Sequence, residues 1–521
     1  MLTKVPTMGI EMTTNQEQKS HRQCIPVQAG SQNFLALFYQ HSGDGELGVL
    51  ALDDYQRGYV WDVKKITQMV KDLKDFQDEK NQENHLLPYY MGTVLLHQDK
   101  NKRYIIDGQQ RITSLCLLHQ LLKKELPTGH ELGYSAQSAR TIRDAFNVLQ
   151  ETKQDELPNE AIFEQITFTV IVVQDIDLAF TFFDTQNNRG VPLEATDLLK
   201  AYHLRAIKDE TAALDLQRDA ASRWENIQRQ PSVLSSGDDF APYLFRLFLW
   251  RARMWQGKRI EPAHHDGLLD EFQEDTWQQN IKENATLDTI PIYACRNNQL
   301  ASAMQLINGQ LLLKNNSFSL SNDPADLPMA VRQPLYKGLC FFLFAEKYTA
   351  ILQNLMNNEI KEEEVKSFRN VYKKLLLANQ IYLREIFMVS SLLYVDQFGY
   401  AGLSEFALRL EYALGSIRLD KKQVRRETAA NYFRDGQLNL LDVIIQSYHP
   451  NQVFNYLKKQ EAACQEIYAA SEVKLDSTVQ GRYKKAVLEF YDDEKKENFK
   501  DFADKHHWLE TWIKKEAANV R

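Results

Sequence analysis

The stretch IIDGQQRITSL, residues 105–115, decides how the first part of the chain is interpreted. Its apolar start is typical of a strand that ends at Asp107, Gly108 permits a tight turn, and a helix begins near Arg111. A helix N-terminus offers free N–H groups and a positive dipole end, and an arginine can bind phosphate through paired hydrogen bonds. Asp107 is suited to holding Mg²⁺ or to positioning a water molecule. These residues predict an anion site, but a turn whose polar groups satisfy one another explains them as well.

A second polar segment, YQRGYVW, covers residues 55–61. Arg57 lies between aromatic residues just before a predicted helix, so it is a candidate second phosphate ligand, with Tyr55 or Trp61 stacking on a base. The alternative is that Tyr59 and Trp61 belong to the core and that Arg57 pairs with a carboxylate.

A third polar segment, FFDTQNNRGVPLEATDLLKAY, covers residues 182–202. Asn188, Arg189 and Gly190 form a polar turn between two predicted helices, and Asn188 and Arg189 are candidates to face a ligand. The alternative is a well-capped loop. Because three polar turns interrupt a mostly apolar pattern, we expect Asp107, Gln110 and Arg111 to line one cleft together with Arg57 and Asn188.

The distribution of strand and helix signals predicts an α+β chain. Apolar and β-branched runs at 48–52, 89–97, 103–108 and 166–173 alternate with helical periodicity, which indicates an α/β domain over residues 34–215. From residue 216 to 521 strand signals become rare and long amphipathic segments dominate, which predicts an all-helical region of one or two subdomains. Residues 1–33 are polar and without pattern, and we expect a flexible arm there.

Composition narrows the classes of function. With 62 basic and 70 acidic residues, the net charge of −8 does not fit a protein that holds nucleic acid by bulk charge, although a local basic groove remains compatible. No run of about 18 apolar residues indicates a membrane span, and the first residues lack the apolar core of a signal peptide. Five scattered cysteines without a CxxC pair favour a reducing, cytoplasmic environment.

Four motifs together resemble a known family, the ParB-like domain at the N-terminus of GmrSD-type restriction endonucleases. That family shows YQRxYxW, GxxxL, IDGQQRxTxL and FxxxNxRGxPLxxxDLLKA in this order, and here they correspond to residues 55–61, 92–96, 106–115 and 183–201. The resemblance covers about residues 34–210, and the later helical region is only loosely similar to the region after this domain in such proteins.

The resemblance implies a ParB/sulfiredoxin-like α/β core that binds a nucleotide, and in several members hydrolyses an NTP to power or gate DNA restriction. Carried over by motif, it implies catalytic roles for Asp107 and Arg111, with Asp107 also a Mg²⁺ ligand. It implies nucleotide-binding roles for Gln56, Arg57, Gly108, Gln109, Gln110 and Asn188. The base of the nucleotide is left open.

Two departures from relatives concern chemistry in the first domain. Family members often place a proline before the YQR element, where this chain has Asp53 and Asp54, two carboxylates that would weaken a phosphate site or bind a metal. Sulfiredoxin's motif has a cysteine where this chain has Gln109, and Cys116 lies further along among leucines, so peroxiredoxin repair is not expected.

A third departure concerns residues 216–521. Many relatives carry a C-terminal HNH-type nuclease domain, but the nearest fragment here, His449-Pro450-Asn451, opens a predicted helix without a partner motif. Adjacent histidines at 264–265 and 506–507 point about 100° apart on a helix and are poor joint ligands.

The motifs leave three hypotheses. The first is a nucleotide-dependent component of a restriction or phage-defence system, whose helical region reads DNA or engages a nuclease-bearing partner protein. The second is a non-enzymatic sensor of nucleotide or DNA backbone with the same fold. The third, a metal-dependent DNA nuclease, ranks last because only Asp107, Asp53 and Asp54 supply carboxylates near the motifs.

Overall fold

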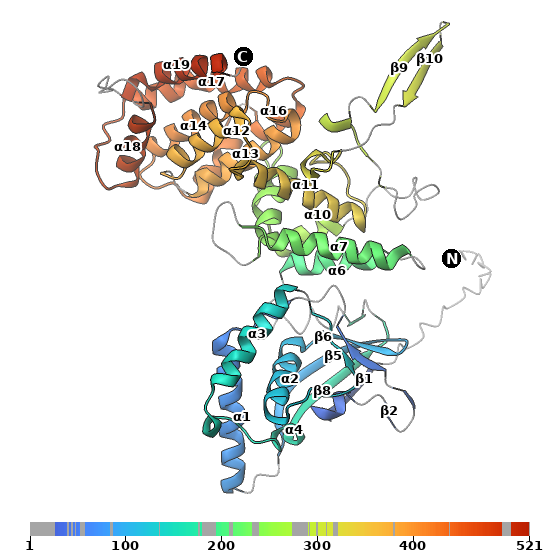
Figure 1. Cartoon of the computed structure of the whole chain (residues 1–521). Helices are drawn as coiled ribbons and strands as arrows, with labels where there is room; N and C mark the ends of the chain where they lie inside the picture. Colours follow the sequence, from blue (N-terminus) through green and yellow to red (C-terminus); the bar gives the residue numbers. More distant parts are fainter. Residues whose placement is uncertain are drawn as a thin grey trace, which may run out of the picture. The chain divides into compact units, whose positions relative to one another are not determined.

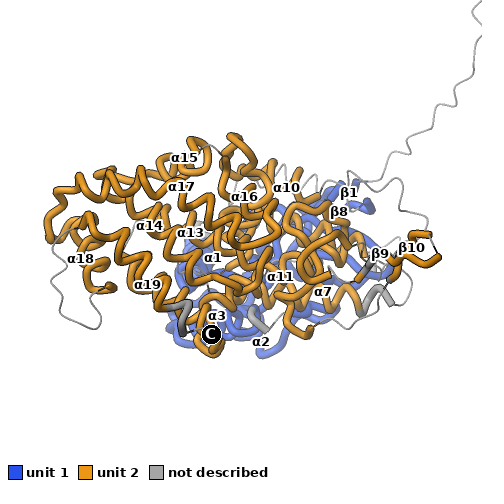
Figure 2. Tube along the Cα trace, turned by 90° about the horizontal axis from the view of Figure 1, so that it is seen from above, with its two compact units in different colours: residues 1–192 blue, residues 193–521 orange. Residues whose placement is uncertain are grey.

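The computed structural model describes a large part of the chain, and its contacts divide it into two compact units, residues 1–192 and 193–521 (Figure 2). The described residues are 27–38, 41–42, 45–46, 48–52, 58–83, 87–134, 136–175, 178–179, 194–207, 212–231, 239–273, 290, 292–298, 301–308, 310–315, 321–378, 381–436, 438–491 and 502–519. Among them, no helix is both long enough and apolar enough to cross a bilayer.

A six-stranded mixed sheet forms the centre of the first unit (Figure 1). In spatial order its strands are β1 (Val27–Asn33), β8 (Ile166–Val173), β5 (Tyr89–Asp99), β6 (Lys102–Asp107), β4 (Val49–Ala51) and β7 (His130–Glu131). The β1–β8 and β5–β6 pairs are antiparallel, and the β8–β5, β6–β4 and β4–β7 pairs are parallel. A separate small hairpin joins β2 (His41–Ser42) and β3 (Gly45–Glu46).

Helices cover one face of this sheet and build its core with it. They are α1 (Val63–Glu83), α2 (Gln109–Lys123), α3 (Ala136–Glu151) and α4 (Ile162–Gln165), with short 3₁₀ turns η1 (Leu35–Phe38) and η2 (Gln154–Glu156). Val70 of α1 and Leu115 of α2 are buried together with Phe168 of β8. Asp62 caps α1, because its Oδ1 accepts a hydrogen bond of 3.0 Å from the backbone N–H of Lys65.

The second unit is a helical assembly, as its long amphipathic segments predict. Its α-helices are α6 (Ala195–Ala206), α7 (Ala212–Gln228), α8 (Ala241–Tyr243), α9 (Trp250–Met254), α10 (His265–Gln273), α11 (Leu339–Met356), α12 (Glu363–Val371), α13 (Ile381–Phe398), α14 (Leu403–Asp420), α15 (Arg426–Arg434), α16 (Leu440–Gln446), α17 (Pro450–Ala469), α18 (Val479–Tyr491) and α19 (Lys505–Asn519). The described residues of this unit also include two π-helical segments, η3 (Leu244–Leu249) and η7 (Tyr372–Leu376), and the 3₁₀ turns η5 (Arg296–Asn298), η6 (Pro324–Asp326) and η8 (Phe502–Asp504). Helix α13 is buried around most of its circumference, which makes it a central helix of the unit.

Three details differ from the sequence-based expectation. The predicted arm over residues 1–33 is wrong for its last seven residues, because they form β1, an edge strand whose mostly exposed side chains show no apolar alternation. Helix α6 packs against α7 and α10, so the division between the units precedes it rather than following residue 215. The helical region also contains a two-stranded hairpin, β9 (Ser302–Ile307) and β10 (Gln310–Asn315). In the sequence, Asn308-Gly309 stands between the two strand ranges, and such a dipeptide is the signal that could have predicted this hairpin.

Candidate functional site

The turn from β6 to α2 has the predicted strand–glycine–helix form. Gly108 has φ 102° and ψ 0°, a left-handed conformation that favours glycine, and a Cβ there would lie only 2.9 Å from Cγ2 of Val94. The N–H of Ile112 donates to the Gly108 carbonyl at 3.0 Å, which closes the first turn of α2. Because Gly108 has no side chain, it gives the helix N-terminus no side-chain cap.

Arg111 is held in place by two partners. Its Nη1 donates to the Met91 carbonyl at 3.1 Å, and its Nη2 pairs with Oδ2 of Asp107 at 3.2 Å. Gly92 makes room for the guanidinium, since a Cβ at that position would lie 2.3 Å from Nη1. The side chains of Arg111 and Asp107 remain 23% and 32% exposed. Within the described residues, these contacts engage two of the five N–H groups of Arg111 and leave donors for a ligand.

Tyr90 lies beside this pair and was missed by the sequence analysis. Its hydroxyl donates to Oγ1 of Thr169 at 3.1 Å and lies 3.4 Å from Oγ1 of Thr93, yet 60% of the residue is exposed. The hydrogen bonds with Thr169 and Thr93, with a smaller contribution from the charge of Arg111, lower the pKa of Tyr90. The only signal for it was its place two residues before Gly92, and aromatic residues within a strand more often belong to the core.

Gln110 connects two of the motifs rather than facing outward. Its Nε2 donates to the Gly58 carbonyl at 3.1 Å, and its Oε1 accepts from the Val60 N–H at 2.9 Å. The two ends of one side-chain amide thus bind the end of the YQRGYVW segment to the first turn of α2. Gln110 therefore joins these two segments, and its contact with a nucleotide, implied by the family resemblance, stays a prediction.

The aromatic residues that follow Arg57 pack in or against the hydrophobic core, which agrees with the alternative to base stacking. Tyr59 is 1% exposed, its backbone N–H donates to Ser138 Oγ at 3.0 Å, and its hydroxyl lies 2.8 Å from Ser114 Oγ. Burial raises the pKa of Tyr59 to about 12. Trp61 packs partly buried against the same core, which does not favour a stacking role.

The remaining site residues divide into two groups. Asp107, Gly108, Gln109, Gln110 and Arg111 lie together at the β6–α2 turn, and Gln109, the first residue of α2, is buried. The other predicted contributors lie outside the described residues, and their convergence on this turn stays a prediction: they are Asp53, Asp54, Tyr55, Gln56, Arg57, Asn188 and Arg189.

Two side chains that other chemistries would use are structural. Cys116 is buried in α2, and burial raises the pKa of its thiol far above the ordinary value. His449 is the N-cap of α17, where its Nδ1 accepts a hydrogen bond from the Asn451 N–H at 3.2 Å. Neither residue has the surroundings of a nucleophile or of a nuclease metal ligand.

Comparisons with known families also divide the chain into two parts, but their boundary lies between residues 204 and 216, after α6, whereas the division by contacts lies before α6. Residues 37–204 match the family described as GmrSD restriction endonuclease, N-terminal domain. Residues 216–471 match a family of unknown function (DUF7834). Among curated proteins, none matches the chain.

Proposed function

Because residues 37–204 form an N-terminal domain of the GmrSD restriction endonuclease type, we propose that the chain is a nucleotide-binding, NTP-hydrolysing component of a restriction or phage-defence system. In this proposal the β6–α2 turn binds the phosphates, and the helical unit engages DNA or a nuclease-bearing partner protein. The observation that carries the proposal is Arg111, a fixed and partly exposed guanidinium at the start of a helix.

Three groups at the turn support phosphate binding. The Met91 carbonyl and Asp107 hold Arg111 in one orientation, so little conformational entropy is lost when the remaining N–H groups meet an anion. The N-terminus of α2 adds the positive end of its dipole. The exposed hydroxyl of Tyr90 adds a hydrogen-bonding group beside the guanidinium.

Asp107 fits a magnesium ion that is bound mostly by phosphate oxygens and water. Mg²⁺ commonly takes only one or two protein carboxylates when it binds with a nucleotide. Oδ2 of Asp107 pairs with Arg111, so Oδ1 is the oxygen proposed to serve the ion. Bound there, Mg²⁺ would neutralise part of the phosphate charge, while Asp107 keeps Arg111 oriented.

The same pairing supports the second hypothesis, a sensor without hydrolysis. Oδ2 of Asp107 is already paired with Arg111, so Asp107 would orient the guanidinium and bind the ligand without activating a nucleophile. Phosphate release by the purified chain, measured with and without DNA, separates hydrolysis from binding alone. Metal-dependent nicking of a plasmid tests the nuclease hypothesis.

Thermal-shift measurements on the full chain test nucleotide binding directly. ATP, GTP, CTP and UTP are each added with Mg²⁺, and a ligand at about 100 times its dissociation constant adds about 2.7 kcal/mol of stability. Arg111→Ala should reduce the affinity roughly ten- to hundredfold, because charge-assisted hydrogen bonds contribute about 1.5–3 kcal/mol. Arg143→Ala, an exposed arginine on α3, is the matched control and should bind like the wild type.

The outcomes are distinct. The absence of a shift with all four nucleotides in the wild type would end the nucleotide proposal. A shift of full size in Arg111→Ala would keep the ligand and remove Arg111 from its site.

A further inference from the structure

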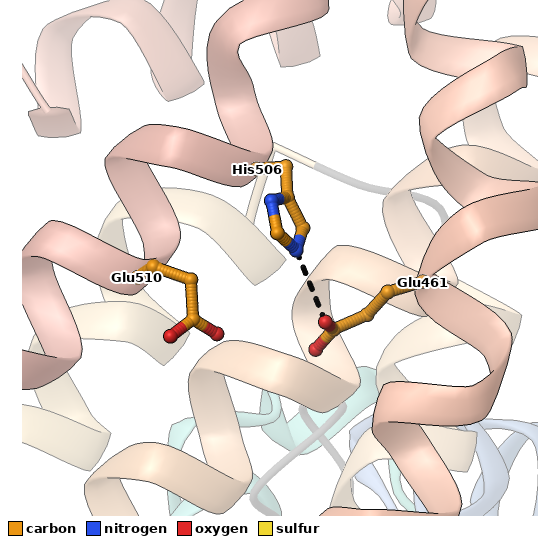
Figure 3. A group of neighbouring side chains, drawn as sticks. All are labelled: Glu461, His506 and Glu510. Carbon is orange, nitrogen blue, oxygen red and sulfur yellow. Dashed lines mark hydrogen bonds and ion pairs between the residues drawn. The ribbon is translucent and has the colours of Figure 1, made fainter.

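In the second unit, one imidazole and two carboxylates from different helices converge (Figure 3). His506 and Glu510 are one turn apart on α19, and Glu461 comes from α17. One ligand atom from each of the three side chains lies within 4.8 Å of the other two, and Nε2 of His506 is 3.1 Å from Oε2 of Glu461. His506 thus meets two carboxylates, whereas its sequence neighbour His507 is exposed.

A buried arginine from α14 lies behind the two carboxylates. Arg409 is 1% exposed, and its Nη1 contacts Oε1 of Glu461 at 2.5 Å and Oε1 of Glu510 at 2.8 Å. Its Nε donates to Glu405 at 2.8 Å. Each of Glu461 and Glu510 therefore gives one oxygen to Arg409 and keeps the other, the arrangement in which outer groups orient metal-binding carboxylates.

Charge and access both suit a cation. Three carboxylates, those of Glu405, Glu461 and Glu510, face the single buried guanidinium of Arg409. Glu510 and His506 are about one-third exposed, so an ion can enter from solvent.

We propose that Glu461, His506 and Glu510 form a binding site for a divalent transition-metal ion of the zinc class. An imidazole nitrogen with two carboxylate oxygens suits such ions better than Mg²⁺ or Ca²⁺, which prefer oxygen alone. Bound ligand atoms would each lie about 2.0–2.2 Å from the metal, so the three atoms must draw closer together. The partly exposed side chain of Glu510 can make that adjustment.

Metal binding at this site would link α19 to α17. With three protein ligands, the ion would keep at least one coordination position for water, as it does in catalytic zinc sites. The site lies wholly in the second unit and is independent of the nucleotide proposal. The competing explanation is an ion-pair network without metal, in which His506 simply pairs with Glu461.

Calorimetric titration of the chelator-treated full chain with Zn²⁺ distinguishes these explanations. We expect one tight zinc site per chain in the wild type and in His507→Ala, the matched control on the same helix. His506→Ala and Glu510→Gln should each weaken binding about tenfold or more. Melting temperatures without metal show whether each variant is folded, and Glu510→Gln serves as the test if His506→Ala does not fold.

Three results would overturn the proposal. They are the absence of zinc binding in the wild type, undiminished binding in a folded His506→Ala or Glu510→Gln variant, and an equal loss of binding in His507→Ala. The first of these would leave the ion-pair network around Arg409 as the whole role of the cluster.

Discussion

Each unit contains a carboxylate paired with a cation, and the two pairs differ in burial. The Asp107–Arg111 pair of the first unit is partly exposed, whereas the side chains of Glu411 and Lys505 in the second unit are 0% exposed. Both pairs have hydrogen-bond geometry. A carboxylate and a cation in contact therefore do not by themselves indicate a binding site, and the hydrogen-bonding capacity left over decides the role of each pair.

Lys505 has no such capacity left. Its Nζ contacts both oxygens of Glu411 at 3.0 and 2.9 Å, and the hydroxyls of Tyr468 and Tyr483 at 2.8 Å each. An ammonium has three N–H groups, so these partners saturate it. Gly415 creates the space, because a Cβ there would overlap the Tyr483 hydroxyl. The Lys505 group is structural, whereas Arg111 keeps donors for a ligand.

The largest loss of stability is expected from Lys505→Met. Glu411 would stay buried without its cation, and breaking a buried pair in this way costs about 3–5 kcal/mol of unfolding free energy. Urea unfolding followed by circular dichroism measures the loss. Lys514→Met changes an exposed lysine on the same helix and should stay within about 0.5 kcal/mol of the wild type. Equal stability of the two variants would remove the distinction between the pairs.

His203 is a buried group of the second unit that, unlike the Glu411–Lys505 pair, carries no charge. His203 of α6 stacks on Phe341 with ring centroids 3.9 Å apart, and its Nε2 lies 2.9 Å from the Phe272 carbonyl. Its Nδ1 accepts from the Gly338 N–H at 3.2 Å, so the ring must be neutral in this arrangement. Burial lowers the pKa of His203 to about 3.

The second unit should therefore lose stability in mild acid. Below pH 6.5 the unfolded chain protonates His203 while the folded chain does not until the pH nears 3, so stability falls as the pH falls. Between pH 7 and pH 5 the loss from this residue is about 2 kcal/mol. Urea unfolding at both pH values should show a smaller difference for His203→Gln, whereas exposed His264→Gln should behave like the wild type. An unchanged pH difference in His203→Gln would contradict the buried neutral ring.

The sequence was sufficient to predict those elements that are determined by neighbouring residues. The β6–α2 turn arises from an apolar run, one glycine and a helical repeat, all within eleven residues, 105–115. The β8 strand, Ile166–Val173, has the bounds that its β-branched run predicts. In both cases, propensity and periodicity act over neighbouring residues.

It was insufficient where partners lie far apart in the chain. The side-chain amide of Gln110 is of a type that often binds ligands, so the motif alone predicts a ligand contact. Its hydrogen-bond partners, residues 58 and 60, lie about fifty positions away and could not be predicted from the motif. Arg409 likewise meets Glu461 and Glu510 only after three helices pack. Strand β1 is held by backbone hydrogen bonds to β8, which side-chain patterns do not record.

An intermediate loss of stability is expected from Gln110→Ala. It removes two hydrogen bonds that join residues 58–60 to α2, each worth about 0.5–1.5 kcal/mol. The direct measurement is hydrogen exchange of the Val60 amide, which donates to Gln110 in the wild type and should lose protection in the variant. Gln68→Ala, an exposed glutamine on α1, should leave that amide protected. Retained protection in Gln110→Ala would show that the two motifs are joined by other contacts.

The smallest effect on stability is expected from Arg111→Ala, and it bears most directly on the comparison. The variant loses an exposed ion pair worth at most about 1 kcal/mol and a hydrogen bond of similar size to the Met91 carbonyl. Asp107 is one-third exposed, so water can replace its lost partner, which water cannot do for Glu411. Urea unfolding should therefore place Arg111→Ala no more than about 2 kcal/mol below the exposed control Arg143→Ala and above Lys505→Met in stability. A loss as large as that of Lys505→Met would show that Arg111 serves the fold, and the guanidinium would no longer support a phosphate site.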